Sequence, residues 1–224
     1  ANLRTIEGFA AAIAYLDRAV AADPGFAAAY AELGSCWALR SFPEFGDVPA
    51  DQGMPKARDA IRRALDLDPA SGAAHSWRGV IMLLHDRDLD GAERALREGL
   101  ELDPDFGLGY TWLACVLAIR LRFDESLDAV QQALALDPLS ITTQLVACRC
   151  YFWAGRLPEA LQYAQAVVDA WSRNILGVVW KARVLRQLGR PEEALTVLET
   201  GLEVFGQDYR LLGPLALQYA RVGR

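Results

Sequence analysis

The sequence has little of what an enzyme usually needs. Its 224 residues include only two histidines, His75 and His85, and no G-x-S-x-G, H-E-x-x-H or glycine-rich phosphate loop occurs. His75 falls at a core place of a predicted helix, and His85 ends that helix, where a cation suits the helix dipole. No convergent set of polar residues remains. We therefore predict that the chain is not an enzyme and needs no cofactor.

One stretch has the start of a calcium loop but lacks its end. Residues 86–91 read Asp-Arg-Asp-Leu-Asp-Gly, which matches the first half of the EF-hand pattern. The twelfth place, which should hold a bidentate glutamate, is Arg97. The ninth place is Arg94, a cation where a cation should bind. We therefore predict no metal site.

Basic charge and long apolar runs are also scarce. The chain has 23 Lys and Arg against 29 Asp and Glu, a net charge of -6, which argues against nucleic acid as the main ligand. Its longest apolar stretch, residues 107–119, is too short to cross a bilayer. We expect neither a nucleic-acid nor a membrane partner for this segment.

The cysteines are few and show no metal-binding spacing. There are four, at Cys36, Cys115, Cys148 and Cys150, with no C-x-x-C pair and no histidine nearby. We interpret them as buried, reduced thiols, which favours a reducing compartment and so a cytoplasmic location.

A short motif recurs at nearly constant spacing. Leu-x-Leu-Asp-Pro ends at Pro69, Pro104 and Pro138, 35 and 34 residues apart, and Asp23-Pro24 is an earlier copy. Each interval carries two amphipathic helical stripes. In residues 107–137 these stripes are Tyr110, Leu113, Ala114 and Leu117, then Leu127, Val130, Ala133 and Leu134. The pattern predicts an all-α protein made of repeated helical hairpins.

These residues resemble the tetratricopeptide repeat, whose pattern is W-x2-L-G-x2-Y, then A-x3-F, then P. The matches in one unit are Tyr30, Leu33, Gly34, Trp37, Ala57, Ile61, Ala64 and Pro69. Small residues recur where two helices must approach closely: Gly34, Gly79, Ala114, Cys148, Ala182 and Ala216. The resemblance implies a right-handed α-solenoid, an alpha-alpha superhelix that binds other proteins.

The resemblance covers nearly the whole chain, residues 1–224, which we interpret as a single array cut from a longer protein. The predicted units are 1–26 (partial), 27–71, 72–106, 107–140, 141–174, 175–208 and 209–224 (partial). Unit 27–71 contains an inserted loop at about 41–55, rich in proline and glycine. This loop is either a lengthened connection or a binding loop that presents Phe42 and Phe45.

The start of the chain, the long connection and the turn near His85 look similar to arrays in bacterial signalling proteins. In those families the array often follows a winged-helix transcriptional regulator domain or a class III adenylate cyclase domain. The resemblance implies what could precede this segment and places it in a bacterial signalling or transcription-regulating protein.

In tetratricopeptide arrays the first helix of each unit lines a concave groove that holds a partner. On this face we place Thr142, Leu145, Arg149, Phe152 and Trp153, then Leu176, Val179, Arg183, Arg186 and Gln187, and finally Arg210, Leu217 and Arg221. Arginine and tryptophan are frequent in binding hot spots, and arginine suits carboxylates. Either the groove binds an acidic or C-terminal peptide, or these arginines pair with Asp and Glu of neighbouring units.

Two further interpretations remain open. The last predicted helix, residues 208–222, bares an apolar stripe of Leu212, Leu215 and Tyr219, which suggests that the array forms a homodimer. A small-molecule sensor is the other interpretation, and it requires a deep pocket in the groove.

Overall fold

The computed structural model describes residues 6–42, 46–170 and 174–222. In these ranges it contains twelve α-helices, one short π-helix and no strand, so the predicted all-α class is confirmed. The elements are α1 (Ile6–Ala22), α2 (Ala27–Arg40), α3 (Ala50–Leu67), α4 (Gly72–Ile81), the π-helix η1 (Met82–Asp86), α5 (Leu89–Leu102), α6 (Gly107–Ile119), α7 (Phe123–Leu136), α8 (Ile141–Trp153), α9 (Leu157–Ala170), α10 (Ile175–Gln187), α11 (Pro191–Phe205) and α12 (Tyr209–Val222).

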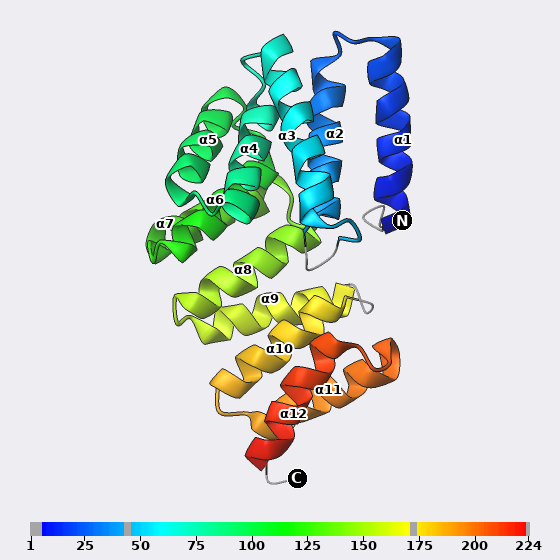
Figure 1. The fold of residues 1–224 in the computed structure, drawn as a ribbon. Helices are drawn as coiled ribbons and strands as arrows, with labels where there is room; N and C mark the ends of the chain where they lie inside the picture. Colours follow the sequence, from blue (N-terminus) through cyan, green and yellow to red (C-terminus); the bar gives the residue numbers. More distant parts are fainter. Residues whose placement is uncertain (1–5, 43–45, 171–173, 223–224) are drawn as a thin grey trace. The chain divides into compact units, whose positions relative to one another are not determined.

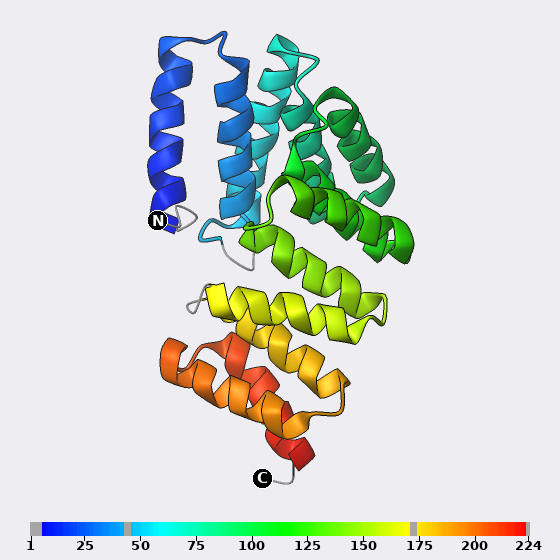
Figure 2. The ribbon, with the colours of Figure 1, turned by 180° about the vertical axis from the view of Figure 1, so that it is seen from behind.

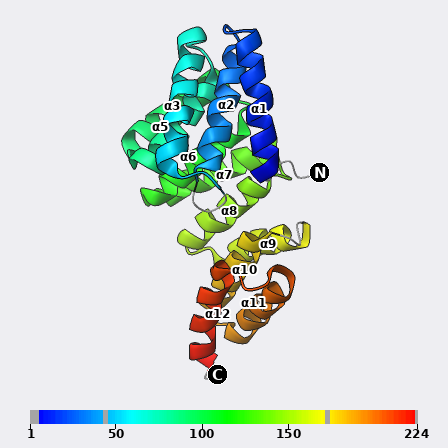
Figure 3. The same ribbon diagram turned by 45° about the vertical axis from the view of Figure 1, so that its right-hand side comes forward.

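The chain divides into two compact units, residues 1–116 and 117–224. In the first unit α2 packs on α3 and α4 on α5, while α1 packs on α2 (Figures 1 and 3). In the second unit α8 packs on α9 and α10 on α11 (Figure 2). A second helix also packs on the first helix of the next pair, as α3 does on α4, α9 on α10 and α11 on α12. This alternation is the hairpin stack that the repeat predicts.

The recurring Asp-Pro pair ends a helix in the same way each time. Asp68, Asp103 and Asp137 have φ of -137°, -138° and -141°, because a residue before proline is excluded from helical geometry. In each, one carboxylate oxygen accepts the backbone N–H two residues further on, at 3.1, 3.3 and 3.2 Å. The motif is therefore a helix stop and a turn in one.

Small residues stand where the two helices of a hairpin touch. A Cβ on Gly34 would lie 2.6 Å from the side chain of Ile61, and one on Gly79 would lie 2.8 Å from Leu96. The later members of the predicted series are Ala114, Cys148 and Ala182, all buried. Ala216 is the exception and corrects the prediction. It is exposed, because α12 buries a different face.

The inserted loop is shorter than predicted. Pro49 precedes α3, which begins at Ala50, so residues 50–55 are helical although Pro55 lies inside the helix. Burial of Gly53 and Met54 stabilises this first part of α3. Phe42 is half-buried and packs edge-on against the ring of Trp112 at 6.5 Å. Phe45 lies outside the described residues, and the binding-loop alternative stays a prediction.

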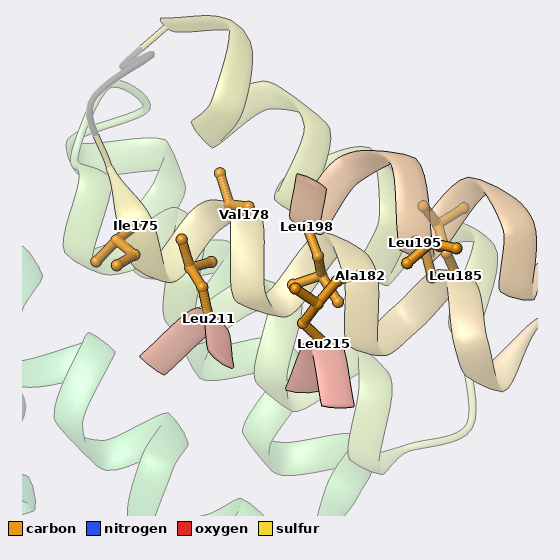
Figure 4. Packing of buried hydrophobic residues seen from close by; sticks show 9 residues of the cluster. Ile175, Val178, Ala182, Leu185, Leu195, Leu198, Leu211 and Leu215 are labelled. Carbon is orange, nitrogen blue, oxygen red and sulfur yellow. The ribbon is translucent and has the colours of Figure 1, made fainter. Parts of the chain in front are cut away.

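The core of the second unit corrects the predicted stripe on the last helix. Figure 4 shows Leu211 and Leu215 of α12 lying among side chains of α10 and α11. Leu215 is only 6% exposed, and the Tyr219 hydroxyl donates to Glu199 of α11 at 2.9 Å. Of the three predicted residues, only Leu212 is exposed. The stripe mostly packs inward because α11 covers it.

Candidate functional site: an arginine and tryptophan surface on α8 and α10

Two first helices, α8 and α10, pack against each other and carry most of the predicted groove residues. Each is started by a side-chain cap: Ser140 accepts the N–H of Thr143 at 3.3 Å, and Asn174 accepts that of Gly177 at 2.9 Å. Arg149 and Trp153 are four residues apart on α8 and so share a face. The guanidinium carbon of Arg149 lies 5.1 Å from the centre of the Trp153 ring.

Trp180 of α10 contacts both the aromatic and the arginine side chains of the site. Its ring centre lies 5.8 Å from that of Phe152 and 6.3 Å from that of Trp153, both edge-on. The guanidinium carbons of Arg149 and Arg183 lie 5.8 and 4.4 Å from the same ring centre. We call these five residues the arginine–tryptophan cluster. Edge-on aromatic pairs and cations over indoles are both favourable contacts, so the cluster holds its own shape.

Arg149 is held by rings rather than by a carboxylate. Within the described residues it forms no ion pair, and its Nε is buried without a hydrogen-bond partner. A buried donor left unpaired is costly and uncommon. The adjacent Cys148 thiol has its pKa raised to about 12 by burial, against the opposing charges of Arg149 and Arg183. This thiol therefore stays neutral, and the positive charge nearby is not compensated by it.

The other predicted groove residues do not all join the cluster. Arg210 is bound at both its Nε and its terminal nitrogen by Asp208, two residues away, at 2.9 and 2.7 Å. Leu176 and Val179 are half-buried and pack against the core of α10, α11 and α12. The remaining predicted groove residues are exposed or half-buried and lie outside the cluster: Thr142, Leu145, Arg186, Gln187, Leu217 and Arg221.

Trp180 is the residue that sequence reasoning missed. Trp180 occupies the same repeat position as Val146 of α8, which is buried. The repeat pattern therefore does not predict that Trp180 is part of the groove. The available signal was its spacing, because Trp180 stands three residues before Arg183 and such pairs touch on a helix. In the structure Trp180 is half-buried and links the two helices.

Two cavities lie outside the cluster. One of about 400 Å³ lies between α3 and α4 and has Arg58, Ile61 and Arg78 in its wall. Another of about 270 Å³ is bordered by α9, α10 and α11. Neither includes a residue of the arginine–tryptophan cluster.

The described residues contain no group of three or more His, Cys, Asp or Glu side chains placed to hold a metal ion. His75 is buried and its Nε2 lies 2.8 Å from the carbonyl oxygen of Pro69. Asp88 accepts the N–H of Gly91 at 2.9 Å and caps α5, which gives the calcium-like stretch a structural role. In the same part of the chain, no helix is both long and apolar enough to span a bilayer.

Comparison with known proteins gives a family and a fold. A family model described as Tetratricopeptide repeat matches residues 3–46, 54–106 and 113–175, more than half of the chain. No curated protein matches. The solved structure of pilF from Pseudomonas aeruginosa has a TM-score of 0.67 and 18% identity, over 88% of this chain and 84% of that one.

Two further solved structures have the same architecture. PilW, a type IV pilus biogenesis factor, has a TM-score of 0.72 and 16% identity, over 93% of this chain and 91% of that one. YrrB, described as a TPR protein with an unusual peptide-binding site, has a TM-score of 0.58 and 18% identity, over 88% and 96%. At these identities the likeness concerns the fold alone.

Proposed function

This chain belongs to the tetratricopeptide repeat family, and from that premise we propose that it is a protein-binding module whose arginine–tryptophan cluster takes an acidic segment of a partner. Proteins of this family generally mediate contacts between proteins. YrrB, which shares the fold, is described as having a peptide-binding site. The module acts as a scaffold or regulator and performs no chemistry of its own.

The observation that carries this proposal is the state of Arg149. Its guanidinium lies over two indole rings and its Nε is buried without a partner. A guanidinium held in this way has lost much of its conformational freedom before a ligand arrives. A carboxylate that reaches it forms a charge-assisted hydrogen bond at a small entropic cost. Trp153, at 36% exposure, offers an apolar surface beside that charge.

The charge of the site contrasts with the rest of the chain. The chain is acidic, with a net charge of -6, yet Arg149, Arg183 and Arg186 lie within two neighbouring helices. Opposite charge steers a partner toward such a site and fixes its register. The resemblance to bacterial signalling arrays further suggests that the module serves a signalling or transcription-regulating protein, which the neighbouring coding sequence would reveal.

The test uses fluorescence anisotropy with two labelled peptides that alternate glutamate or glutamine with leucine. We expect the glutamate peptide to bind and the glutamine peptide to bind at least about tenfold more weakly. Arg183→Glu with Arg186→Glu should weaken binding and leave the thermal unfolding curve nearly unchanged. Arg62→Glu, at an exposed arginine of α3, is the matched control and should change neither. Equal binding of both peptides would refute the proposal.

The source of the carboxylate is separable in the same assay. A free C-terminal acid and a C-terminal amide of the glutamate peptide should bind alike if side chains supply the charge. Preference for the free acid would assign the site to a chain terminus.

A further inference from the structure

The two cavities, one at α3 and α4 and the other at α9, α10 and α11, occupy the same position in the repeat. Both lie between a second helix and the first helix that follows it. Four residues of the second wall stand three repeats after residues of the first wall: Leu161 after Arg58, Gln165 after Arg62, Lys181 after Arg78 and Leu185 after Met82. The two walls can therefore be compared residue by residue.

Each cavity has a cation at a repeat position that is otherwise apolar. This position stands directly before the small residue of each first helix. It is apolar and buried in four of the first helices, at Leu33, Leu113, Ala147 and Leu215. In α4 and α10 it is instead a half-buried cation, Arg78 and Lys181. Because partial burial disfavours a charge, each of these cations needs a matching anion.

In the α3–α4 cavity the protein supplies that anion. A terminal nitrogen of Arg78 donates to Glu98 of α5 at 2.7 Å and lies 3.0 Å from Nδ1 of His75, although the Nε of Arg78 is buried without a partner. The other two arginines of this wall also have carboxylate partners: Arg58 has Asp86 and Arg62 has Asp59. The wall holds three arginines and three aspartates, so its charges balance.

In the α9–α11 cavity both partners of the cation have been replaced. Three repeats after Glu98 stands Gly201, and three repeats after His75 stands Val178. Neither side chain can pair with a cation. Within the part of the chain that the structure describes, the side chain of Lys181 has no ion pair and no hydrogen bond. The repeat has kept the cation and lost its counter-charge.

The carboxylate in the wall of this cavity is already bound. Glu193 of α11 accepts hydrogen bonds from Arg190 on both of its oxygens, at 2.5 and 2.6 Å. These hydrogen bonds do most to lower the pKa of Glu193, and the more distant charge of Lys181 contributes least. The wall holds two cations, Lys181 and Arg190, and one anion. It therefore has one positive charge in excess, unlike the α3–α4 cavity.

The rest of the wall defines the size and polarity of a ligand. Leu161, Leu185 and Val197 give the cavity an apolar surface beside Lys181. Its volume of about 270 Å³ is below the roughly 300–1,000 Å³ of sites for drug-sized molecules. A small molecule with one negative charge and a short apolar tail matches both the charge and the surface.

We propose that the α9–α11 cavity binds a small aliphatic monocarboxylate. The carboxylate pairs with the ammonium group of Lys181, in the role that Glu98 has for Arg78, and the aliphatic chain packs on the three apolar side chains. Lysine offers a compact charge with three donors, which suits a single carboxylate. Because Lys181 is only half-buried, water screens the pair, and we expect a dissociation constant on the order of 1 mM.

The lysine content of the chain allows a direct test by NMR. Lys56 and Lys181 are its only lysines, so selective ¹³C labelling of lysine gives two ε-methylene signals. Hexanoate should shift the Lys181 signal saturably. Hexanamide, which lacks the charge, and acetate, which lacks the tail, should bind at least about fivefold more weakly. The Lys56 signal should not shift, because Lys56 lies over the ring of Trp37 at 4.2 Å, outside both cavities.

Two variants test the site from the side of the ligand. Lys181→Met should lower the affinity for hexanoate at least about fivefold in saturation-transfer NMR. Lys56→Met removes the same charge elsewhere and should leave binding unaltered. Thr196→Glu, at an exposed residue of the wall, adds a carboxylate within the chain and should also weaken binding. It serves as the second variant if Lys181→Met fails to fold by circular dichroism.

Three outcomes would each overturn the proposal. They are a Lys181 signal that responds equally to hexanoate and hexanamide, a Lys181→Met variant that binds hexanoate as the wild type does, and a wild-type chain that shows no saturable shift up to about ten times the expected dissociation constant.

Discussion

The hairpins α4–α5 and α8–α9 are copies of one repeat, but the arginines of their first helices have different contacts. In the first, Arg78 of α4 donates to Glu98 of α5 at 2.7 Å, and His75 lies 3.1 Å from the same carboxylate. In the second, Arg149 of α8 lies over indole rings without an ion pair in the described residues. One hairpin pairs the terminal nitrogen of its arginine with a carboxylate, and the other holds its arginine over indole rings. The Nε of both arginines is buried without a hydrogen-bond partner.

The turns of the same two hairpins also differ. Arg87 and Gly155 each follow the first helix and both have positive φ, 55° and 76°. Leu121 and Gly189 occupy the same place in the other turns, at φ of 62° and 74°, so the four residues are 34 apart. The repeat therefore requires a left-handed residue here, and glycine supplies it without the steric cost that arginine and leucine bear.

The largest effect should come from reversing the charge of the uncompensated arginine. Arg149→Glu should weaken binding of the glutamate peptide by at least about tenfold, because like charges then meet in a partly buried site. Arg78→Glu should instead lower stability and leave binding nearly unaltered, because it places two carboxylates together. Anisotropy and thermal unfolding of both variants decide this. Similar losses of peptide binding in the two variants would contradict the proposed difference in function between the two hairpins.

Removing the ring that links α8 to α10 should have the next largest effect. Trp180→Ala should cost about 2 kcal/mol of unfolding free energy, less than a fully buried tryptophan, because the side chain is half-buried. Peptide binding should fall as well, since Arg149 and Arg183 lose a shared support. Urea unfolding with Trp180→Phe as the control measures this. An equal loss in the phenylalanine variant would argue against simple ring support.

Removing the glycine from one turn and adding a glycine to the other should change the free energy of unfolding in opposite directions. Gly155→Ala should cost about 1 kcal/mol, because the new Cβ has room but the backbone is strained. Arg87→Gly should gain up to about 1 kcal/mol by relieving that strain. Chemical denaturation of both variants gives the two values. A stabilising Gly155→Ala would show that the two turns are not equivalent.

The smallest effect concerns pH. Burial raises the pKa of Asp86 at the end of η1, but hydrogen bonds from Arg58 and His85 outweigh it and lower the pKa overall. The hydrogen bond from Arg156 lowers the pKa of Glu159 at the start of α9. Both carboxylates therefore stabilise the fold above their ordinary pKa values, and this contribution is lost as pH falls through the lowered values.

Unfolding between pH 6 and pH 2 tests that pH dependence. Asp86→Asn should flatten the acid limb more than Glu159→Gln, because Asp86 has two partners, Arg58 and His85, whereas Glu159 is lowered by Arg156 alone among side chains. A larger effect of Glu159→Gln would reverse this ranking.

The sequence predicts the helices well wherever the helical stripe and the Asp-Pro stop agree. The stripes of residues 107–137 correspond closely to α6 and α7, which begin at Gly107 and end at Leu136. Propensity fails at Pro55, because burial of Gly53 and Met54 outweighs the lost hydrogen bond. The repeat pattern also fails to identify the surface cluster. It identifies positions where the repeats have similar residues, and Trp180 differs from its counterparts in the other repeats. Residues that make a site differ from repeat to repeat by necessity.

The Asp-Pro junctions have a consequence for how such chains change over evolutionary time. Each junction closes its turn with the aspartate's own carboxylate, two residues away. No distant side chain is needed to make the bend. A duplication or deletion that starts and stops at these junctions therefore moves a whole hairpin with both its ends intact, so gene length can drift in steps of one module.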